Sequence, residues 1–231
     1  GTAGVQYALG LGSTPEDWQR AVSAAGVYQT YMDLFGIPFD LTFEALVPAD
    51  LEQPVLRLPF EPGQPWSFTG GPHAGWGTGS AWAALDFAPP GEEFGCFKSD
   101  AWVTAVADGV ILRSGDGQVV QDLDGDGLEQ TGWTILYMHV ESRDRIPAGT
   151  VVKAGDKIGH ASCEGGISNG THLHLARRYN GEWISADAGL PFILSGWISA
   201  GDGEEYSGTL VKDGRIVYSW DGRVDENQIE Y

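Results

Sequence analysis

The chain has 231 residues, of which 42% are apolar and 19% charged, and it holds 34 Gly, 12 Pro and 9 Trp. This composition excludes a disordered chain and predicts a turn-rich, mainly β protein. With 32 acidic against 13 basic residues, the net charge of -19 excludes nucleic acid and anionic membrane surfaces as partners, because both need basic patches. No apolar run approaches the roughly 20 residues that span a bilayer, so we expect no membrane insertion.

The first predicted element is an amphipathic helix that begins after Thr14. Thr14 fits an N-cap and Pro15 the first helical position. Apolar residues then recur at the helical period up to Gly36 and Pro38, so we expect one helix of about five turns. Residues 1–54 are expected to form a helical extension with a proline-rich connector. We favour a helix that packs on its own domain over a propeptide remnant or a helix that binds a partner.

Short apolar runs alternate with Gly-rich turns from residue 55 onward. This spacing predicts an antiparallel β domain over residues 55–190. Near the C-terminus, Lys212-Asp213-Gly214 lies between two apolar runs and predicts a hairpin. We expect residues 191–231 to form a β appendage of the same domain.

The two cysteines, Cys96 and Cys163, leave two possibilities open. In an oxidising compartment they can pair and clamp a loop to the core, whereas inside a cell they would be free, buried thiols. We favour the disulfide.

Two of the five histidines stand at alternate positions in an apolar run. In an extended strand His172 and His174 point to one face, while Leu173 and Leu175 point to the other. Taken alone, this pair is also compatible with a strand that bears two partly exposed histidines. The fifth histidine, His160, follows a turn and is expected to be exposed.

A third histidine and a carboxylate precede this pair. His73 lies in a glycine-dense loop, and Asp86 lies in a predicted strand, where a buried carboxylate needs a hydrogen bond, an ion pair or a metal. Backbone donors alone can satisfy Asp86. Together, however, His73, Asp86 and one of the paired histidines offer two nitrogens and one oxygen, which suits a tetrahedral zinc ion with an open position for water. His139, which shares a face with Tyr137 of a predicted strand, is the fourth participant.

The combination of His73 with Asp86, Tyr137-Met138-His139 and His172-Leu173-His174 resembles the lysostaphin-type zinc metallopeptidases, in particular their beta-lytic or staphylolytic branch. The resemblance covers roughly residues 55–178. It implies a barrel-like antiparallel sheet with a groove and the metal at its floor. It also implies hydrolysis of peptide bonds in bacterial cell-wall (peptidoglycan) cross-links.

The resemblance also assigns roles to the individual residues. It makes His73, Asp86 and His174 the zinc ligands, and His139 and His172 the catalytic residues. One of these two would take a proton from the attacking water and return it to the leaving amine, and the other would donate a hydrogen bond to the oxyanion. The sequence does not decide which histidine does which.

An acidic stretch offers a second candidate metal site. Asp122, Asp124 and Asp126 alternate, with glycine at the sixth position, as at the start of a calcium loop. The twelfth position is Trp133 rather than Glu, so this is no EF-hand, although Glu129 can complete the shell in another geometry. The alternative is a solvated acidic hairpin tip.

The sequence therefore predicts a zinc metalloendopeptidase that is secreted or exposed on the cell envelope, acts as a monomer and takes peptidoglycan peptides. The chain begins at Gly1 rather than Met, which is typical of a processed or trimmed protein. One alternative is a non-catalytic relative that binds cell-wall peptide or regulates another hydrolase. A calcium-dependent carbohydrate-binding module is a third possibility, but it does not explain the histidines.

Overall fold

The computed structural model describes residues 14–36 and 45–231. The chain divides into two units, residues 1–45 and 46–231. Residues 1–13 and 37–44, which belong to the predicted extension, lie outside the described residues. No helix in the described ranges is long and apolar enough to cross a membrane.

The N-terminal unit contains two helices, α2 (Pro15–Ala24) and α3 (Tyr28–Phe35). Thr14 caps α2 as predicted, since its hydroxyl oxygen accepts the backbone N–H of Asp17 at 3.2 Å. The prediction of one continuous helix is wrong, because Gly26 adopts a left-handed conformation (φ 69°) just after α2 ends. The break lets Trp18 of α2 pack edge-on against Tyr31 of α3, with ring centroids 5.1 Å apart.

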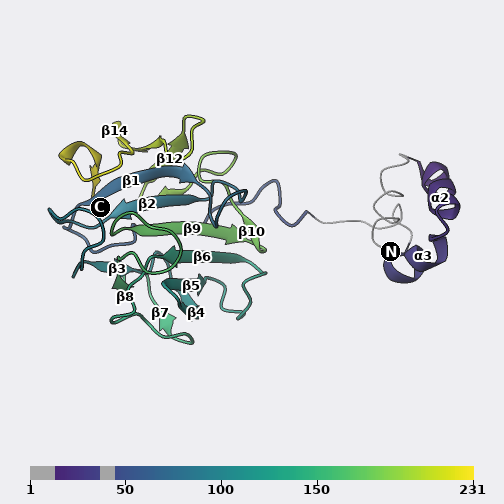
Figure 1. The fold of residues 1–231 in the computed structure, drawn as a ribbon, viewed down its shortest axis with the longest axis horizontal. Coiled ribbons are helices and arrows are strands. Elements are labelled where there is room, and N and C mark those ends of the chain that lie inside the picture. Colours follow the sequence, from purple (N-terminus) through teal and green to yellow (C-terminus); the bar gives the residue numbers. More distant parts are fainter. Residues whose placement is uncertain (1–13, 37–44) are drawn as a thin grey trace. The chain divides into compact units, whose positions relative to one another are not determined.

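Within residues 46–231 the main element is a nine-stranded antiparallel sheet (Figure 1). Its strand order is β15-β1-β2-β9-β6-β5-β4-β7, and β10 also pairs with β9. The strands are β1 (Trp66–His73), β2 (Ala84–Ala88), β4 (Gly109–Gly115), β5 (Gln118–Asp122), β6 (Trp133–Met138), β7 (Val151–Val152), β9 (Leu173–Tyr179), β10 (Glu182–Trp183) and β15 (Gln228–Ile229). The mainly β, antiparallel fold is confirmed, and because β15 and β7 are free edges the sheet is open rather than a closed barrel.

Two smaller sheets complete this unit. One is a pair, β3 (Trp102–Thr104) and β8 (Lys157–His160). The other has the order β11-β12-β13-β14, with the bounds Ile193–Leu194, Trp197–Gly201, Gly208–Lys212 and Arg215–Tyr218. The predicted C-terminal hairpin is β13 and β14, and a short 3-10 helix, η1 (Asp225–Asn227), precedes β15.

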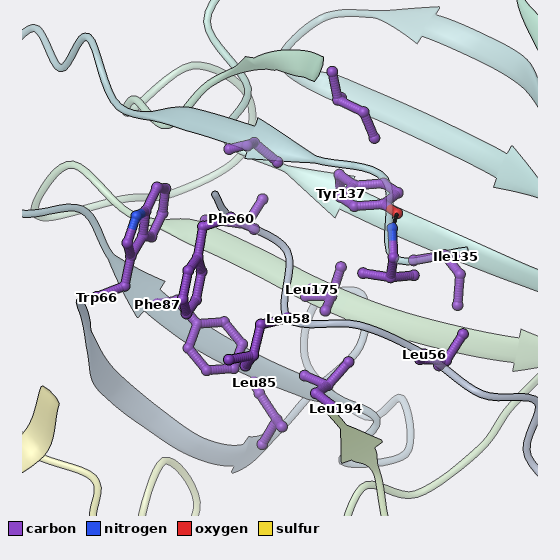
Figure 2. Close-up of a cluster of buried hydrophobic side chains, with 14 of the residues drawn as sticks. Leu56, Leu58, Phe60, Trp66, Leu85, Phe87, Ile135, Tyr137, Leu175 and Leu194 are labelled. Atoms are coloured by element: carbon purple, nitrogen blue, oxygen red, sulfur yellow. Dashed lines mark hydrogen bonds between the residues drawn. The ribbon is translucent and has the colours of Figure 1, made fainter. Parts of the chain in front are cut away.

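One hydrophobic core lies against one face of the main sheet (Figure 2). The aromatic side chains of Phe60 and Trp66 stack there with centroids 5.1 Å apart. Leu175 of β9 contributes from the sheet, and Leu194 of β11 contributes from the C-terminal sheet. The C-terminal sheet and the main sheet therefore share a core.

Strand β1 is the main element that the sequence does not predict. Gly70 and Gly71 give the segment the composition of a loop, yet it pairs with β2 along its length, with two register shifts. His73 therefore ends a strand rather than lying in a loop.

Candidate metal centre

Three neighbouring strands bring His73, Asp86 and His174 together. In the register of β2 and β9, Asp86 lies directly opposite His174, and His73 of β1 pairs with Ala84, two residues before Asp86. Since side chains alternate along a strand, Leu175 enters the core while His174 and Asp86 point to the other face of the sheet. All three site residues are buried.

The ligand atoms of these residues converge on one small volume. The distance from His73 Nε2 to His174 Nδ1 is 3.0 Å, and Asp86 Oδ1 lies 3.2 Å from the first nitrogen and 3.3 Å from the second. The other nitrogen of each ring donates to a main-chain carbonyl: His73 Nδ1 to Gly71 at 2.8 Å and His174 Nε2 to Gly75 at 3.1 Å. A carbonyl can only accept, so in the neutral rings the two converging nitrogens carry lone pairs.

This donor set fits a zinc ion. Three electron-pair donors at such short separations repel one another unless a cation lies between them. Ligand atoms about 2.0 to 2.2 Å from a tetrahedral zinc ion lie roughly 3.3 to 3.6 Å apart, close to the separations observed. Asp86 Oδ1 is buried and accepts no hydrogen bond from any residue in the described ranges. A metal would satisfy this oxygen.

The electrostatics of the group lead to the same conclusion. Burial disfavours the charged form of Asp86, but the charges of His73 and His172 outweigh burial and hold the pKa of Asp86 well below its usual range. Burial likewise opposes protonation of His73, and Asp86 outweighs it, so the pKa of His73 is raised. The site thus holds a carboxylate that attracts positive charge.

His139 and His172 lie beside this group. Their ring centroids are 4.4 Å apart, and His139 lies 6.2 Å from His174. Each donates through Nδ1 to a main-chain carbonyl, His139 to Glu164 at 3.0 Å and His172 to Gly170 at 2.8 Å. Nε2 is therefore the free nitrogen in both neutral rings, and that of His172 lies 3.7 Å from Asp86 Oδ2.

A backbone turn places His139 in the site. The prediction that Tyr137 and His139 share a face is wrong: Tyr137 points into the core, where its hydroxyl accepts the N–H of Val106 and donates to Gln121. Strand β6 ends at Met138, and the positive φ of His139 (64°) redirects its side chain. Burial, followed by the charge of His172, lowers the pKa of His139 to about 4. His139 is consequently neutral at physiological pH.

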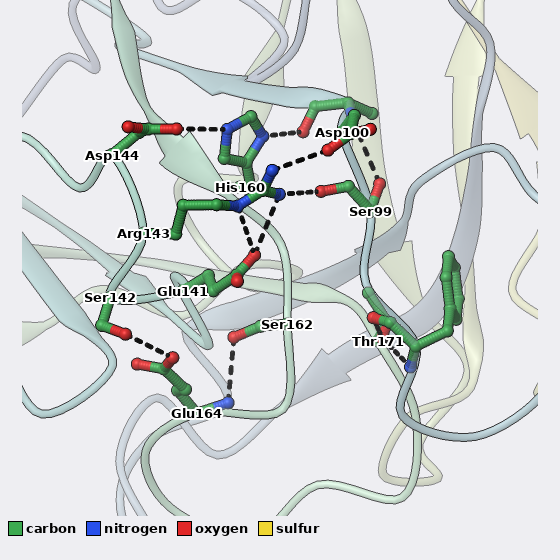
Figure 3. Close-up of polar contacts among 12 residues, drawn as sticks. Ser99, Asp100, Glu141, Ser142, Arg143, Asp144, His160, Ser162, Glu164 and Thr171 are labelled. Carbon is green, nitrogen blue, oxygen red and sulfur yellow. Dashed lines mark hydrogen bonds and ion pairs between the residues drawn. The ribbon is translucent and has the colours of Figure 1, made fainter.

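Polar contacts hold Ser162 and Glu164, both of which bond to His139; Figure 3 shows the contacts of Glu164 with Ser162 and Ser142. The Ser162 hydroxyl donates to the carbonyl of His139 at 2.9 Å and accepts the N–H of Glu164 at 3.0 Å. The carboxylate of Glu164 accepts from Ser142 at 2.9 Å. Glu164, whose carbonyl accepts from the imidazole of His139, is thus held at both its main chain and its side chain.

The prediction that His160 is exposed is wrong. It lies on β8 and is 2% exposed. Its ring packs on Trp102 with centroids 4.0 Å apart, and Nδ1 donates to the carbonyl of Ala101 at 3.1 Å. Its role in the structure is packing.

The metal group and both further histidines line one groove of about 760 Å³. One wall carries two largely exposed apolar side chains, Phe94 and Ile167. The loops that bear them are joined by the disulfide Cys96–Cys163, which the structure forms as predicted.

Residues near the C-terminus form part of the groove that the sequence does not predict. Tyr206, between β12 and β13, stacks on His73 with centroids 4.2 Å apart. Burial, with the charge of Asp86, raises the pKa of its hydroxyl. Arg223, which precedes η1, also lines the groove. Neither residue stands in a motif, and only the packing of the C-terminal sheet on the main sheet brings them here.

The acidic loop remains a predicted calcium site. One oxygen from each of Asp122, Asp124 and Asp126 lies within 4.8 Å of the others. The buried carboxylate of Asp122 accepts three backbone N–H groups, from residues 124, 125 and 127, and is satisfied by them. Glu129 pairs with Arg113 and Arg178, so it does not complete a shell around the aspartates.

Part of the chain matches a known protein family. Residues 89–186 match the model of peptidase family M23. This part of the chain is therefore similar to M23 peptidase domains, and the family resemblance predicted from the histidines is confirmed. The matched range includes His139, His172 and His174, whereas His73 and Asp86 precede it.

Individual relatives agree with the family match. Protease LasA of Pseudomonas aeruginosa is 28% identical over 181 residues, which cover 69% of this chain and 40% of that protein. This chain thus spans less than half the length of that relative. The structure described as pseudoalterin, a novel M23 metalloprotease from the deep sea, is 25% identical with a TM-score of 0.59. The alignment covers 73% of this chain and 96% of that one.

Proposed function

We propose that this protein is a zinc-dependent endopeptidase that hydrolyses peptide bonds in the cross-links of bacterial peptidoglycan. The observation that carries the proposal is the convergence of His73, Asp86 and His174 on a single point, beside two further histidines with free Nε2 atoms. The match to peptidase family M23 and the similarity to Protease LasA support peptide-bond hydrolysis as the reaction.

In this proposal His73 Nε2, Asp86 Oδ1 and His174 Nδ1 hold the zinc ion. Zinc supplies Lewis acidity, which activates water and polarises a carbonyl group. His139 is neutral above a pH of about 4, so its Nε2 can accept a proton from the attacking water and return it to the leaving amine. His172, when protonated at Nε2, can donate a hydrogen bond to the oxyanion that develops on the carbonyl.

Residues 55–190 would carry all five site residues. Residues 191–231 would act as a β appendage that completes the groove, and residues 1–54 as an N-terminal extension. We infer that the protein is secreted or exposed on the cell envelope, because the proposed substrate lies outside the cell membrane. We also propose that it acts as a monomer.

Metal content and product analysis test the proposal together. Wild-type protein should contain about one zinc ion per chain by elemental mass spectrometry. Defined peptidoglycan fragments should be cleaved at a peptide bond, as judged by product masses, and a chelator should stop cleavage. His174→Ala should lose zinc, while His172→Ala and His139→Ala should keep zinc and lose turnover. His160→Gln, a histidine outside the groove, should keep both.

Two results would contradict the proposal. Cleavage by zinc-free wild-type protein would exclude the mechanism. Binding of the fragments by zinc-loaded wild type without turnover would favour the non-catalytic alternative.

A further inference from the structure

Arg223 is an unusual cation in this acidic protein. Among the described residues, most Lys and Arg side chains form a hydrogen bond or an ion pair with the protein, and the exceptions are Lys98, Lys212 and Arg223. Of these three, only Arg223 lines the groove that holds the metal group. Glu93 attracts it electrostatically, but no carboxylate in the described part of the chain lies within ion-pair distance. Its hydrogen-bonding capacity is therefore available to a ligand.

The backbone around Arg223 is fixed by one buried side chain. Asn227 is 1% exposed, and its amide donates to the carbonyl of Gly222 at 2.8 Å and to that of Trp220 at 3.3 Å. Its side-chain oxygen accepts the N–H of Val224 at 3.1 Å. Main-chain atoms on both sides of Arg223 are thus held, so the point from which its side chain extends is fixed before any ligand arrives.

The guanidinium group also contacts a residue that is bonded to the segment leading into β9. It lies over the ring of Phe97, 4.6 Å from its centroid. Phe97 in turn exchanges two hydrogen bonds with the hydroxyl of Thr171, its N–H donating at 2.8 Å and its carbonyl accepting at 2.6 Å. Thr171 directly precedes His172, so a continuous series of contacts connects Arg223 to the side of the groove on which His172 lies.

The contact with Phe97 leaves the N–H groups of Arg223 available to a ligand. Contact of the guanidinium carbon with the aromatic ring uses no N–H group as a hydrogen-bond donor, and the N–H edges of a guanidinium group match the two oxygens of a carboxylate. The remainder of the protein repels such a group, because the net charge is -19 and Asp86 lies in the same groove. A cation without a carboxylate partner at this position therefore provides local selectivity for an anion.

We propose that Arg223 binds a carboxylate of the peptide substrate and makes the enzyme selective for an acidic residue near the cleaved bond, on the His172 side. This inference rests on the proposed function, since it assigns the substrate class of the same groove. Arg223 acts as a specificity residue and takes no part in proton transfer.

Binding of matched peptides tests the assignment without turnover. The probes are capped hexaglycine peptides in which one residue in turn is Glu or its uncharged isostere Gln. Isothermal titration calorimetry on the full chain, with chelator present, should show at one position an about fivefold preference for Glu, the size of one partly exposed ion pair. The preference should shrink as salt is raised. Arg223→Gln should bind Glu no better than Gln, whereas Lys212→Gln, the same charge change outside the groove, should keep the preference.

Three outcomes would overturn the assignment. The first is equal binding of Glu and Gln by wild type at every position. The second is an intact preference in Arg223→Gln. The third is an equal loss of affinity for both peptides in that variant, which indicates a structural role through Phe97. If Arg223→Gln does not fold, the wild-type preference and its salt dependence still decide. Hydrolysis of the same peptides without chelator tests the proposed function separately.

Discussion

Gly70 shows how tightly β1 approaches the metal group. A Cβ atom at this position would lie 2.8 Å from Asp86 Oδ2, so Gly70→Ala should push the carboxylate away from the histidines. We expect zinc affinity to fall by at least about tenfold, because disturbing the residues that orient a metal ligand usually has an effect of this size. Competition with a chromophoric chelator measures this affinity.

The matched control is Gly115→Ala, at the end of β4. A Cβ atom there meets nothing within 4 Å, and neither glycine has a positive φ. Zinc affinity should be unchanged in this variant. Equal zinc affinities in Gly70→Ala and Gly115→Ala would show that the close contact between Gly70 and Asp86 does not hold the carboxylate in place.

His139 should make stability dependent on pH. Its pKa is about 4 in the folded protein and about 6.5 in an unfolded chain, so the unfolded state binds more protons between these values. Its contribution to stability is therefore complete above pH 6.5 and is lost as the pH falls through 4. Between pH 7 and pH 4.5 this loss amounts to about 2 to 3 kcal/mol.

Urea unfolding of zinc-free protein at the two pH values measures this effect. His139→Phe keeps a ring in place and removes the titratable group. Between pH 7 and pH 4.5 the free energy of unfolding of this variant should therefore fall by about 2 to 3 kcal/mol less than that of wild type. An identical pH dependence in the two proteins would contradict the lowered pKa.

Among the elements, strands with alternating apolar and polar residues could be predicted from sequence. The pattern of β9 correctly places Leu175 in the core and His174 on the opposite face. Strand β1 could not be predicted, because its glycines permit close approaches, of Gly70 to Asp86 and of Gly71 to the backbone of Ser207, and do not favour a strand by propensity. The face of His139 could not be predicted either, since the positive φ that follows β6 breaks the alternation.

The disulfide should stabilise two groove loops together. Cys96 and Cys163 are 67 residues apart, and the chain-entropy model assigns about 4 kcal/mol to closing such a loop. Replacing both with serine should lower the free energy of unfolding by about 2 to 4 kcal/mol. It should also speed proteolytic cleavage near Phe94 and Ile167.

Urea unfolding and limited proteolysis check this prediction. A phosphine reductant should reproduce both effects in wild type and should leave the double-serine variant unaffected. If wild type and variant unfold at the same urea concentration, the disulfide does not contribute to stability.

At the scale of the whole molecule, metal binding should be linked to folding. The ligands come from β1, β2 and β9, so only the folded chain presents all three together. At zinc concentrations 100 times the dissociation constant, zinc binding raises the free energy of unfolding by about 2.7 kcal/mol. This corresponds to a rise in melting temperature of about 5 to 10 °C. Differential scanning calorimetry with and without chelator should show this rise in wild type. It should be absent in Asp86→Ala, and a rise of equal size there would exclude Asp86 as a ligand.

The groove as a whole could be predicted only in part. The five residues that resemble a known family stand in short motifs, and these motifs are visible without a structure. Tyr206 and Arg223 reach the groove because the C-terminal sheet shares a core with the main sheet. Contacts between segments so far apart in sequence depend on packing, which no local pattern encodes.

The four histidines of the groove all donate to main-chain carbonyls, and this has a consequence for how the site can change over time. A carbonyl is present whatever residue occupies its position, so no single substitution can delete one of these acceptors. The neighbouring sequence can drift while the tautomers stay fixed, provided that the path of the backbone is preserved. Insertions and deletions, rather than point mutations, are therefore the changes to which this orientation of the rings is most vulnerable.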